Sequence, residues 1–138
     1  MERTFAGYIT ELRRDFTSYC EKELEQDNIT LGLLYPIIYI AKHEGCTQKQ
    51  LGESLFMDNG YVTRTLKKLE SLQMIKRITN DDDKRIINLF LTDNGKSVFE
   101  KSRMLFKKWD EQVFSGINNK EKEQIMSLMQ KIKESRRK

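Results

Sequence analysis

The chain has 138 residues, of which 38% are hydrophobic and 33% charged, and its formal net charge is +4. This is the usual size of one compact domain with a sizeable core. No apolar run approaches the ~20 residues that a membrane-spanning helix needs, and the start of the chain has no apolar signal core, so we expect a cytoplasmic protein. Cys20 and Cys46 match no disulfide framework or paired-cysteine zinc spacing, and we expect both to be reduced.

The basic charge lies in the later parts of the chain. Residues 1–46 hold 5 Lys and Arg against 8 Asp and Glu, residues 47–91 hold 8 against 6, and residues 92–138 hold 12 against 7. The net charges of these segments are −3, +2 and +5. Contact with phosphate groups is therefore expected after residue 46.

Two helices are predicted in the first third of the chain. The first is amphipathic and should end between Glu25 and Asn28. Its apolar positions are Phe5, Ile9, Leu12, Phe16 and Tyr19. The second has Thr30 as N-cap and is apolar almost all round, which predicts a buried central helix. Pro36 removes one of its hydrogen bonds, so we expect a kink or a local loosening there, and Gly45 should stop the helix.

Two short helices joined by a tight turn are predicted next. Thr47 and Gln50 form a capping box at the start of the first, and Asp58 caps the second. Gly52 is small where the two helices should cross, as in a helix-turn-helix. The second helix buries Val62, Leu66 and Leu69 and turns three cations and no acid outward. This outward face comprises Gly60, Tyr61, Arg64, Lys67, Lys68 and Ser71, with Thr63 at its edge.

A β-hairpin is predicted directly after this helix. Residues 74–79 and 87–92 read as two strands around a polar turn, and Ile87, Leu89 and Leu91 alternate along the second strand. A basic helix face followed at once by a hairpin with a charged tip favours nucleic-acid recognition. The alternative, a helical hairpin with a purely structural role, would need neither feature.

Two further helices are predicted at the end of the chain. Thr92 resembles the N-cap of a long helix that Gly116 breaks, and Asn118 with Glu121 resembles the cap of the last helix. The apolar positions are Val98, Ser102, Leu105, Trp109 and Val113 in the first, and Ile125, Leu128, Met129 and Ile132 in the second. Such seams predict pairing with a second copy, and packing within one chain is the alternative.

Residues 55–77 and 82–95 resemble the winged helix-turn-helix regulators of the MarR (multiple antibiotic resistance regulator) family. The matching positions in the hairpin and at the start of the next helix are Asp83, Arg85, Leu91, Thr92 and Gly95. Gln73 is a departure, because the family commonly has Gly after the recognition helix. The resemblance implies one mainly α-helical domain with a small β-hairpin over residues 1–138, with a DNA-binding region over 30–91 and dimerisation helices over 1–28 and 92–138.

The expected function is that of a homodimeric, sequence-specific regulator of transcription that binds a pseudo-palindromic site on double-stranded DNA. We expect a repressor, because a dimer covering promoter DNA blocks polymerase. The predicted DNA-binding residues are Thr47, Gln48, Asn59, Gly60, Tyr61, Thr63, Arg64, Lys67, Lys68, Arg77, Lys84 and Arg85. The predicted dimer interface comprises Phe5, Ile9, Leu12, Trp109, Ile125, Leu128 and Ile132.

The tip of the hairpin has its own physical explanation. An arginine there can enter the minor groove, where negative potential is focused, and a carboxylate two residues away can orient its guanidinium. We therefore predict that Asp83 positions Arg85. Asp81 and Asp82 are predicted to form the turn, because free carboxylates repel phosphate.

Other chemistry finds less support in the sequence. It has no phosphate-binding loop, His-Glu-x-x-His motif or serine-nucleophile elbow, so we expect neither an enzyme nor a cofactor. His43, Glu44 and Cys46 offer too few ligands for a closed metal site, and none is expected. Cys20 is either a small buried hydrophobe or a peroxide-sensing thiol.

An aromatic effector is the remaining question about ligands. The family resemblance implies a pocket, and its candidate lining residues are Phe16, Tyr35 and Tyr39. Aromatic side chains at this spacing also suit a core. Two rival functions stay open at this point: a metal- or thiol-sensing regulator of the same fold, and a winged-helix protein-interaction module that does not bind DNA.

Overall fold

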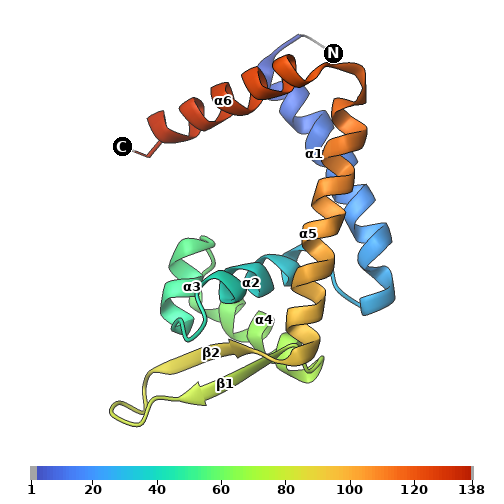
Figure 1. Ribbon diagram of the computed structural model, residues 1–138. Coiled ribbons are helices and arrows are strands. Elements are labelled where there is room, and N and C mark those ends of the chain that lie inside the picture. The colour runs from blue at the N-terminus through green and yellow to red at the C-terminus, as the bar shows by residue number, and fades with distance from the viewer. Residues whose placement is uncertain (1–2, 138) are drawn as a thin grey trace. The chain divides into compact units, whose positions relative to one another are not determined.

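The computed structural model describes residues 3–137 (Figure 1). The chain divides into two compact units, Met1–Leu105 and Phe106–Lys138. The helices are α1 (Phe5–Leu24), α2 (Leu31–Lys42), α3 (Gln48–Ser54), α4 (Asn59–Ser71), α5 (Asp93–Val113) and α6 (Asn119–Ser135), and the strands are β1 (Ile75–Thr79) and β2 (Ile87–Leu91). Short 3-10 helices cover Glu25–Asp27 and Phe114–Gly116. The predicted fold, mainly helical with one hairpin, is confirmed.

The predicted caps explain where the helices begin. The Thr30 hydroxyl accepts a hydrogen bond from the Leu33 N–H at 3.3 Å, and the Asp58 carboxylate accepts one from the Tyr61 N–H at 2.8 Å. Thr92 does the same for the Gly95 N–H at 3.1 Å. Full capping boxes open α3, through Thr47 and Gln50, and α6, through Asn118 and Glu121. Each cap satisfies N–H groups that have no partner within the helix.

Helix α2 lies at the centre of the first unit, as predicted. It continues through Pro36 without interruption and ends at Lys42. Gly45 follows with φ +85°, a conformation that favours glycine. The large fully buried side chains of α2 and of four other elements are Leu24, Leu34, Ile37, Ile40, Leu51, Leu66, Leu69 and Leu89.

Helices α3 and α4 approach each other closely, which Gly52 permits. A Cβ atom at Gly52 would lie 2.9 Å from Cγ2 of Val62, closer than real Cβ atoms come. Val62, Leu66 and Leu69 of α4 are buried. The opposite face of α4 is consequently exposed, as the helical spacing predicts.

The hairpin is joined to the helical core by a third short segment. Strands β1 and β2 pair in antiparallel register, with Ile75 opposite Leu91 and Thr79 opposite Ile87. The connection between α2 and α3 pairs with the other edge of β2: the Gly45 N–H donates to the Leu89 carbonyl at 2.9 Å, and the Leu89 N–H donates to the Cys46 carbonyl at 2.8 Å. The hairpin of β1, β2 and the turn between them is called the wing below. Backbone hydrogen bonds therefore link the wing to the start of α3.

The end of α4 carries an unusual backbone conformation at Gln73. Its φ is +60°, and the Met74 N–H donates to the Leu69 carbonyl, which closes the helix. This left-handed conformation explains why glycine is common here in the family that the sequence resembles. Gly95 has a different reason to be glycine, because a Cβ atom there would collide with the backbone carbonyl oxygen of Met74.

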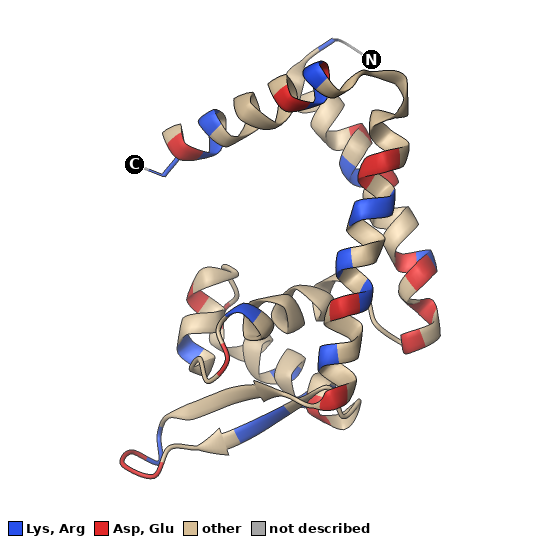
Figure 2. Cartoon of the chain, in the orientation of Figure 1, with Lys and Arg blue, Asp and Glu red and all other residues tan. Residues whose placement is uncertain are grey.

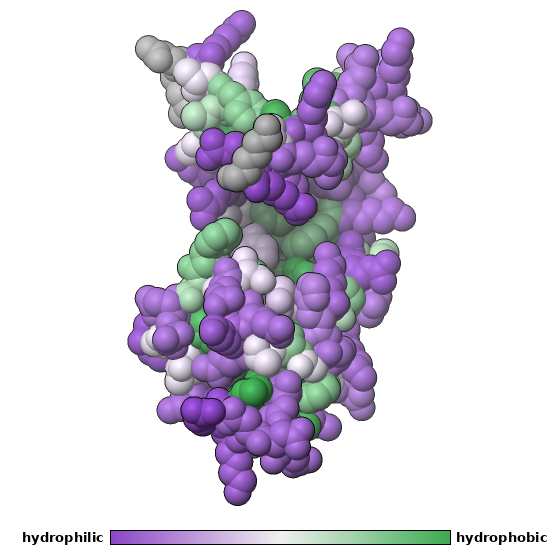
Figure 3. Space-filling view, turned by 90° about the vertical axis from the view of Figure 1, so that its left-hand side faces the viewer, coloured by the Kyte–Doolittle hydropathy of each residue, from purple (hydrophilic) through white to green (hydrophobic). Residues whose placement is uncertain are grey.

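The second unit contains the end of α5 and all of α6. Within the described chain, α6 has no buried residue, and its apolar positions Ile125, Leu128, Met129 and Ile132 are exposed. The face of the molecule in Figure 3 is largely hydrophilic, with smaller hydrophobic areas between the polar side chains. Among residues 3–137, no helix is both long and apolar enough to cross a membrane.

Candidate nucleic-acid interface

The outward face of α4 is the first part of the candidate interface. The side chains of Tyr61, Arg64, Lys67 and Lys68 are exposed, and the buried stripe of the helix lies behind them. Within residues 3–137, no carboxylate lies within ion-pair distance of the three cations. The face therefore presents its positive charge to solvent without internal neutralisation.

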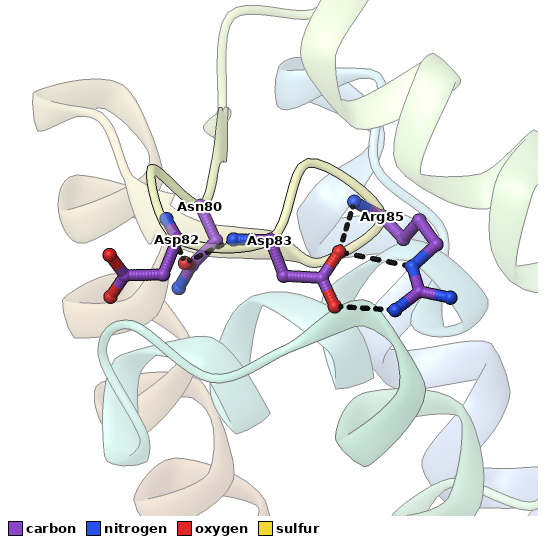
Figure 4. A network of polar contacts seen from close by, with 4 residues as sticks. All are labelled: Asn80, Asp82, Asp83 and Arg85. Carbon is purple, nitrogen blue, oxygen red and sulfur yellow. Dashed lines mark hydrogen bonds and ion pairs between the residues drawn. The ribbon is translucent and has the colours of Figure 1, made fainter.

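The tip of the wing is the second part, and here acidic and basic residues lie side by side (Figure 2). The carboxylate of Asp83 binds the guanidinium of Arg85 through two contacts, Oδ1 to Nε and Oδ2 to Nη2, each 3.1 Å long (Figure 4). Oδ1 also accepts the Arg85 backbone N–H at 3.0 Å. The side-chain bonds from Arg85, and next its backbone bond, hold the pKa of the Asp83 carboxyl below its usual value.

The geometry of this pair leaves part of Arg85 available. Asp83 occupies the edge of the guanidinium formed by Nε and Nη2. The Nη1 group and the second hydrogen of Nη2 point away from that carboxylate. The Arg85 side chain is 91% exposed, so these donors face solvent in a defined orientation.

The Asn80 side chain stabilises the turn that carries the pair. The side-chain oxygen of Asn80 accepts the backbone N–H groups of Asp82 at 2.9 Å and Asp83 at 3.2 Å (Figure 4). Asp81 and Asp82 have exposed side chains. Asp81 and Asp82 therefore lie in the turn, and the Asn80 side chain supplies its hydrogen bonds.

A groove lies between α3, the start of α4 and the wing. Thr47, Gln48, Asn59 and Arg85, all predicted DNA-binding residues, line it together with Lys49, Gly52, Glu53, Met57, Val62, Ile86 and Ile87. Residues predicted from three separate sequence segments are therefore brought to one surface. Gly60 and Lys84 are exposed.

Several predicted contacts are already engaged within the chain. The Thr47 hydroxyl caps α3, and the Gln48 amide donates to the Thr63 hydroxyl at 3.3 Å. Arg77 forms an ion pair with Glu70 at 2.9 Å, and its side chain is mostly covered. Within residues 3–137, the buried Nε of Arg77 and Oε1 of Gln48 have no hydrogen-bond partner. A contact from Arg77 to DNA would compete with Glu70.

The three aromatic residues of the predicted effector pocket are not equivalent. The Tyr39 ring packs on His43 with centroids 4.4 Å apart, and its hydroxyl accepts a bond from Ser54. Tyr39 lines a shallow hollow with His43, Glu44, Gly45, Cys46, Gln50, Glu53 and Ser54. Phe16 and Tyr35 do not line this hollow. Residues 3–137 contain no group of three or more His, Cys, Asp or Glu side chains that could hold a metal ion.

Both cysteines are buried and unpaired as disulfides. Cys20 has no exposed surface, and burial, with a smaller contribution from the Glu21 charge, raises the pKa of its thiol to about 11. Burial also raises the pKa of the Cys46 thiol. A high pKa keeps a thiol protonated at neutral pH, and the protonated form reacts slowly with oxidants.

The predicted interface residues on the terminal helices lie mainly on the surface of the chain. Phe5, Ile9 and Leu12 of α1 are exposed, as are Ile125, Leu128 and Ile132 of α6. Trp109 of α5 is half-buried.

Sequence reasoning missed three residues that shape the candidate interface. Asn80 forms the wing turn, Asn88 binds the Asn80 amide, and Glu70 holds Arg77. The Asn-Asp-Asp sequence of the turn was a usable signal for Asn80, because asparagine commonly bonds to the backbone two residues later. No local signal marks the other two.

Comparison with known proteins agrees with this geometry. A sequence model described as the MarR family matches residues 37–87. A MarR transcriptional regulator from Methanosarcina mazei has a TM-score of 0.87 at 23% identity, covering 97% of this chain and 96% of its own. The MepR–DNA complex from S. aureus has a TM-score of 0.83 at 24% identity, covering 97% and 99%. These structures share the fold.

Sequence relatives extend the comparison to the family. The HTH-type transcriptional regulator BilQ of Clostridioides difficile is 30% identical, over 91% of this chain and 85% of its own. BilQ of Clostridium symbiosum is 44% identical, over 96% of this chain and 92% of its own. Identity at this level across nearly the full length of both proteins shows that the chain belongs to the MarR family of winged helix-turn-helix transcription regulators.

Proposed function

We propose that the chain is a homodimeric repressor that binds a pseudo-palindromic operator on double-stranded DNA. The observation that carries the proposal is the exposed cationic face of α4 beside a wing whose arginine is already held by Asp83. The major groove of B-DNA admits an α-helix, and a narrow minor groove attracts arginine. Helix α4 would read the first, and Arg85 would enter the second.

The comparisons support this assignment. The similar MepR structure is a complex with DNA, and the BilQ relatives are HTH-type transcriptional regulators. A regulator that acts on DNA also fits a cytoplasmic location. The function requires no catalytic step, and we assign the chain no enzymatic activity.

Dimerisation is supported by the apolar residues that α1 and α6 expose. Large apolar side chains at helical spacing, such as Leu12 and Leu128, are costly to leave in water. A second copy would cover them and would place two α4 helices about one turn of DNA apart, roughly 10 base pairs. In a dimer, these positions would change from exposed to buried.

A small aromatic effector is a further part of the proposal. Tyr35 and Phe16 remain its candidate lining residues, whereas Tyr39 belongs to the hollow beside His43. A thiol sensor is the weaker candidate, because Cys20 is fully buried and burial raises its pKa. A metal sensor lacks a ligand cluster in the described part of the chain.

Selection of bound duplexes from a random-sequence library tests the DNA function. We expect one enriched site with two half-sites related by two-fold symmetry. Failure to enrich any sequence, together with binding that does not depend on salt, would favour a protein-interaction module instead.

Sedimentation tests the dimer. We expect a mass of twice the 16.4 kDa chain at micromolar concentration. Leu128→Lys, in the apolar stripe of α6, should shift the population toward the monomer. Gln130→Lys, on the same helix but outside the stripe, is the matched control and should leave the mass unchanged. A single-chain mass for the unmodified protein would refute the symmetric operator.

A further inference from the structure

A series of side-chain amide contacts connects the tip of the wing to the helical core. The Asn88 amide nitrogen donates to the Gly45 carbonyl at 2.9 Å, across 43 positions of sequence. The Asn88 oxygen accepts from the Asn80 amide nitrogen at 3.3 Å. The Asn80 oxygen in turn accepts the N–H groups of Asp82 and Asp83. Both asparagines are partly buried.

The direction of these hydrogen bonds is fixed by backbone groups at both ends. The carbonyl of Gly45 can only accept, so the amide nitrogen of Asn88 must face it. The backbone N–H groups of Asp82 and Asp83 can only donate, so the oxygen of Asn80 must face them. The remaining nitrogen of Asn80 then meets the remaining oxygen of Asn88. Turning either amide around would place two donors or two acceptors against each other.

The inner end of this series lies where the wing joins the start of α3. Gly45 also donates its N–H to Leu89, and Thr47, the N-cap of α3, forms an isolated bridge with Asn88. Asn88 therefore lies beside the residues that begin the helix-turn-helix. Its amide extends this connection outward to Asn80, the residue that follows β1 and begins the turn.

The Asp83–Arg85 pair alone does not determine where Arg85 lies on the molecule. Asp83 orients the guanidinium relative to residues two positions away in the same loop. The loop itself extends from a two-stranded ribbon, and such ribbons are only marginally stable without further support. An additional anchor is needed if Arg85 is to keep a constant position relative to α3.

We propose that Asn80 and Asn88 are positioning residues that hold the wing tip, and with it Arg85, in a fixed place relative to the start of α3. The wing and the helix-turn-helix then read DNA as one rigid unit. This inference rests on the proposed function, in which Arg85 contacts DNA. Neither asparagine itself touches DNA in this mechanism; each acts through Arg85.

A double-mutant cycle on DNA binding tests the dependence on Arg85. Asn88→Val introduces a residue that favours a strand and removes both hydrogen bonds of the Asn88 side-chain amide. We expect it to reduce the ratio of affinities for the selected operator and a scrambled duplex by about threefold to tenfold, the effect of one or two ordinary hydrogen bonds. In an Arg85→Ala background, the same substitution should cause no further loss.

Asn80→Ser supplies an independent variant. A serine hydroxyl can still accept a bond from the turn backbone but is too short to reach Asn88. Its effect should therefore match that of Asn88→Val in direction and depend equally on Arg85. Asn94→Ala, which changes an exposed asparagine at the start of α5, is the control and should leave the affinity ratio unchanged. Equal losses from Asn88→Val with and without Arg85 would overturn the proposal, because they would indicate a general structural role.

A measurement without DNA separates this inference from the proposed function. Residual dipolar couplings of the backbone N–H groups should fit residues 80–86 and α3 to one alignment tensor in the unmodified protein. In Asn88→Val, we expect the couplings of residues 80–86 alone to shrink, while those of α3 and β1 persist. Unchanged couplings would refute the positioning role. Suppose that Arg85→Ala leaves operator binding intact, while Asn88→Val shrinks the couplings of residues 80–86. The role of the wing in DNA binding would then be refuted, and the positioning role of Asn88 would stand.

Discussion

The outward face of α4 and the tip of the wing both carry arginine, but they prepare it in different ways. Arg64 and its neighbours Lys67 and Lys68 have no ion-pair partner within residues 3–137. Arg85 is bound at two atoms by Asp83 although its side chain is almost entirely exposed. The helix thus offers exposed cations without an ion-pair partner in the described chain, whereas the wing offers an oriented cation on a two-stranded ribbon.

The two surfaces therefore differ in how much side-chain conformational entropy they would lose on binding DNA. Long side chains on α4 lose rotamer freedom only when they contact DNA, and that loss reduces their net contribution. At the wing, Asp83 restricts Arg85 before binding. In the proposed complex, Asp83 would also place a negative charge near phosphate, which would weaken binding to any sequence. We therefore expect α4 to supply more of the affinity and the wing to supply more discrimination per contact.

The largest expected effect is that of Arg64→Ala. If Arg64 makes a good base contact in the major groove, its loss should weaken operator binding by about 1–3 kcal/mol. Titration of labelled operator at one fixed salt concentration measures this. Arg103→Ala removes an exposed arginine from α5 that pairs with Glu100, and it should bind normally. Full affinity in Arg64→Ala would mean that this face of α4 does not read the bases.

Asp83→Asn tests the wing, and its sign distinguishes two explanations. Removing the anion should lower operator affinity by about threefold to tenfold, because Arg85 loses the charge-assisted bonds that orient it. Affinity for a scrambled duplex should hold or rise, since one repulsive charge near phosphate is gone. The measured quantity is the ratio of the two affinities. A constant or larger ratio would reduce Asp83 to an ordinary turn residue.

Lys67→Ala and Lys68→Ala test whether the two lysines on the outward face of α4 contact phosphate. If each lysine neutralises one phosphate, its removal should make the fall of log affinity with log salt less steep by about 0.9. The ratio of operator to scrambled affinity should change little, because phosphate contacts carry no sequence information. Affinity measured over a series of salt concentrations checks both statements. A lysine whose removal alters the ratio at constant slope would be a base contact.

The smallest effect is expected for Gln73→Gly at the end of α4. Glycine adopts the observed φ of +60° without the steric cost that a Cβ atom brings. We expect the free energy of unfolding to rise by about 0.5–1 kcal/mol, with DNA affinity unchanged. Denaturant unfolding measures this, and Gln73→Ala, which keeps the Cβ atom, is the matched control. Destabilisation by glycine would show that the Gln73 side chain outweighs the backbone strain.

The elements of this fold could be predicted from the sequence because their signals are local. Thr47, Asp58 and Asn118 each lie three residues from the N–H group that they cap, and Gly52 lies where a short turn brings α4 close. The Asp83–Arg85 pair was predictable for the same reason, since two positions separate its members.

The contacts that were missed depend on the tertiary structure. Asn88 reaches Gly45 across 43 positions, so no sequence window contains both partners. Arg77 has the sequence character of an exposed cation on a strand, but the end of α4 brings Glu70 within 2.9 Å of it.

The absence of any buried residue in α6 within the described chain has a thermodynamic consequence. A helix of 17 residues with little tertiary packing is only marginally stable in water, whatever its capping box contributes. If a second copy covers its apolar stripe, then ordering of α6 and association of the two chains become a single equilibrium. The melting temperature would then increase with protein concentration, and dilution alone would begin to unfold the C-terminal part of the protein.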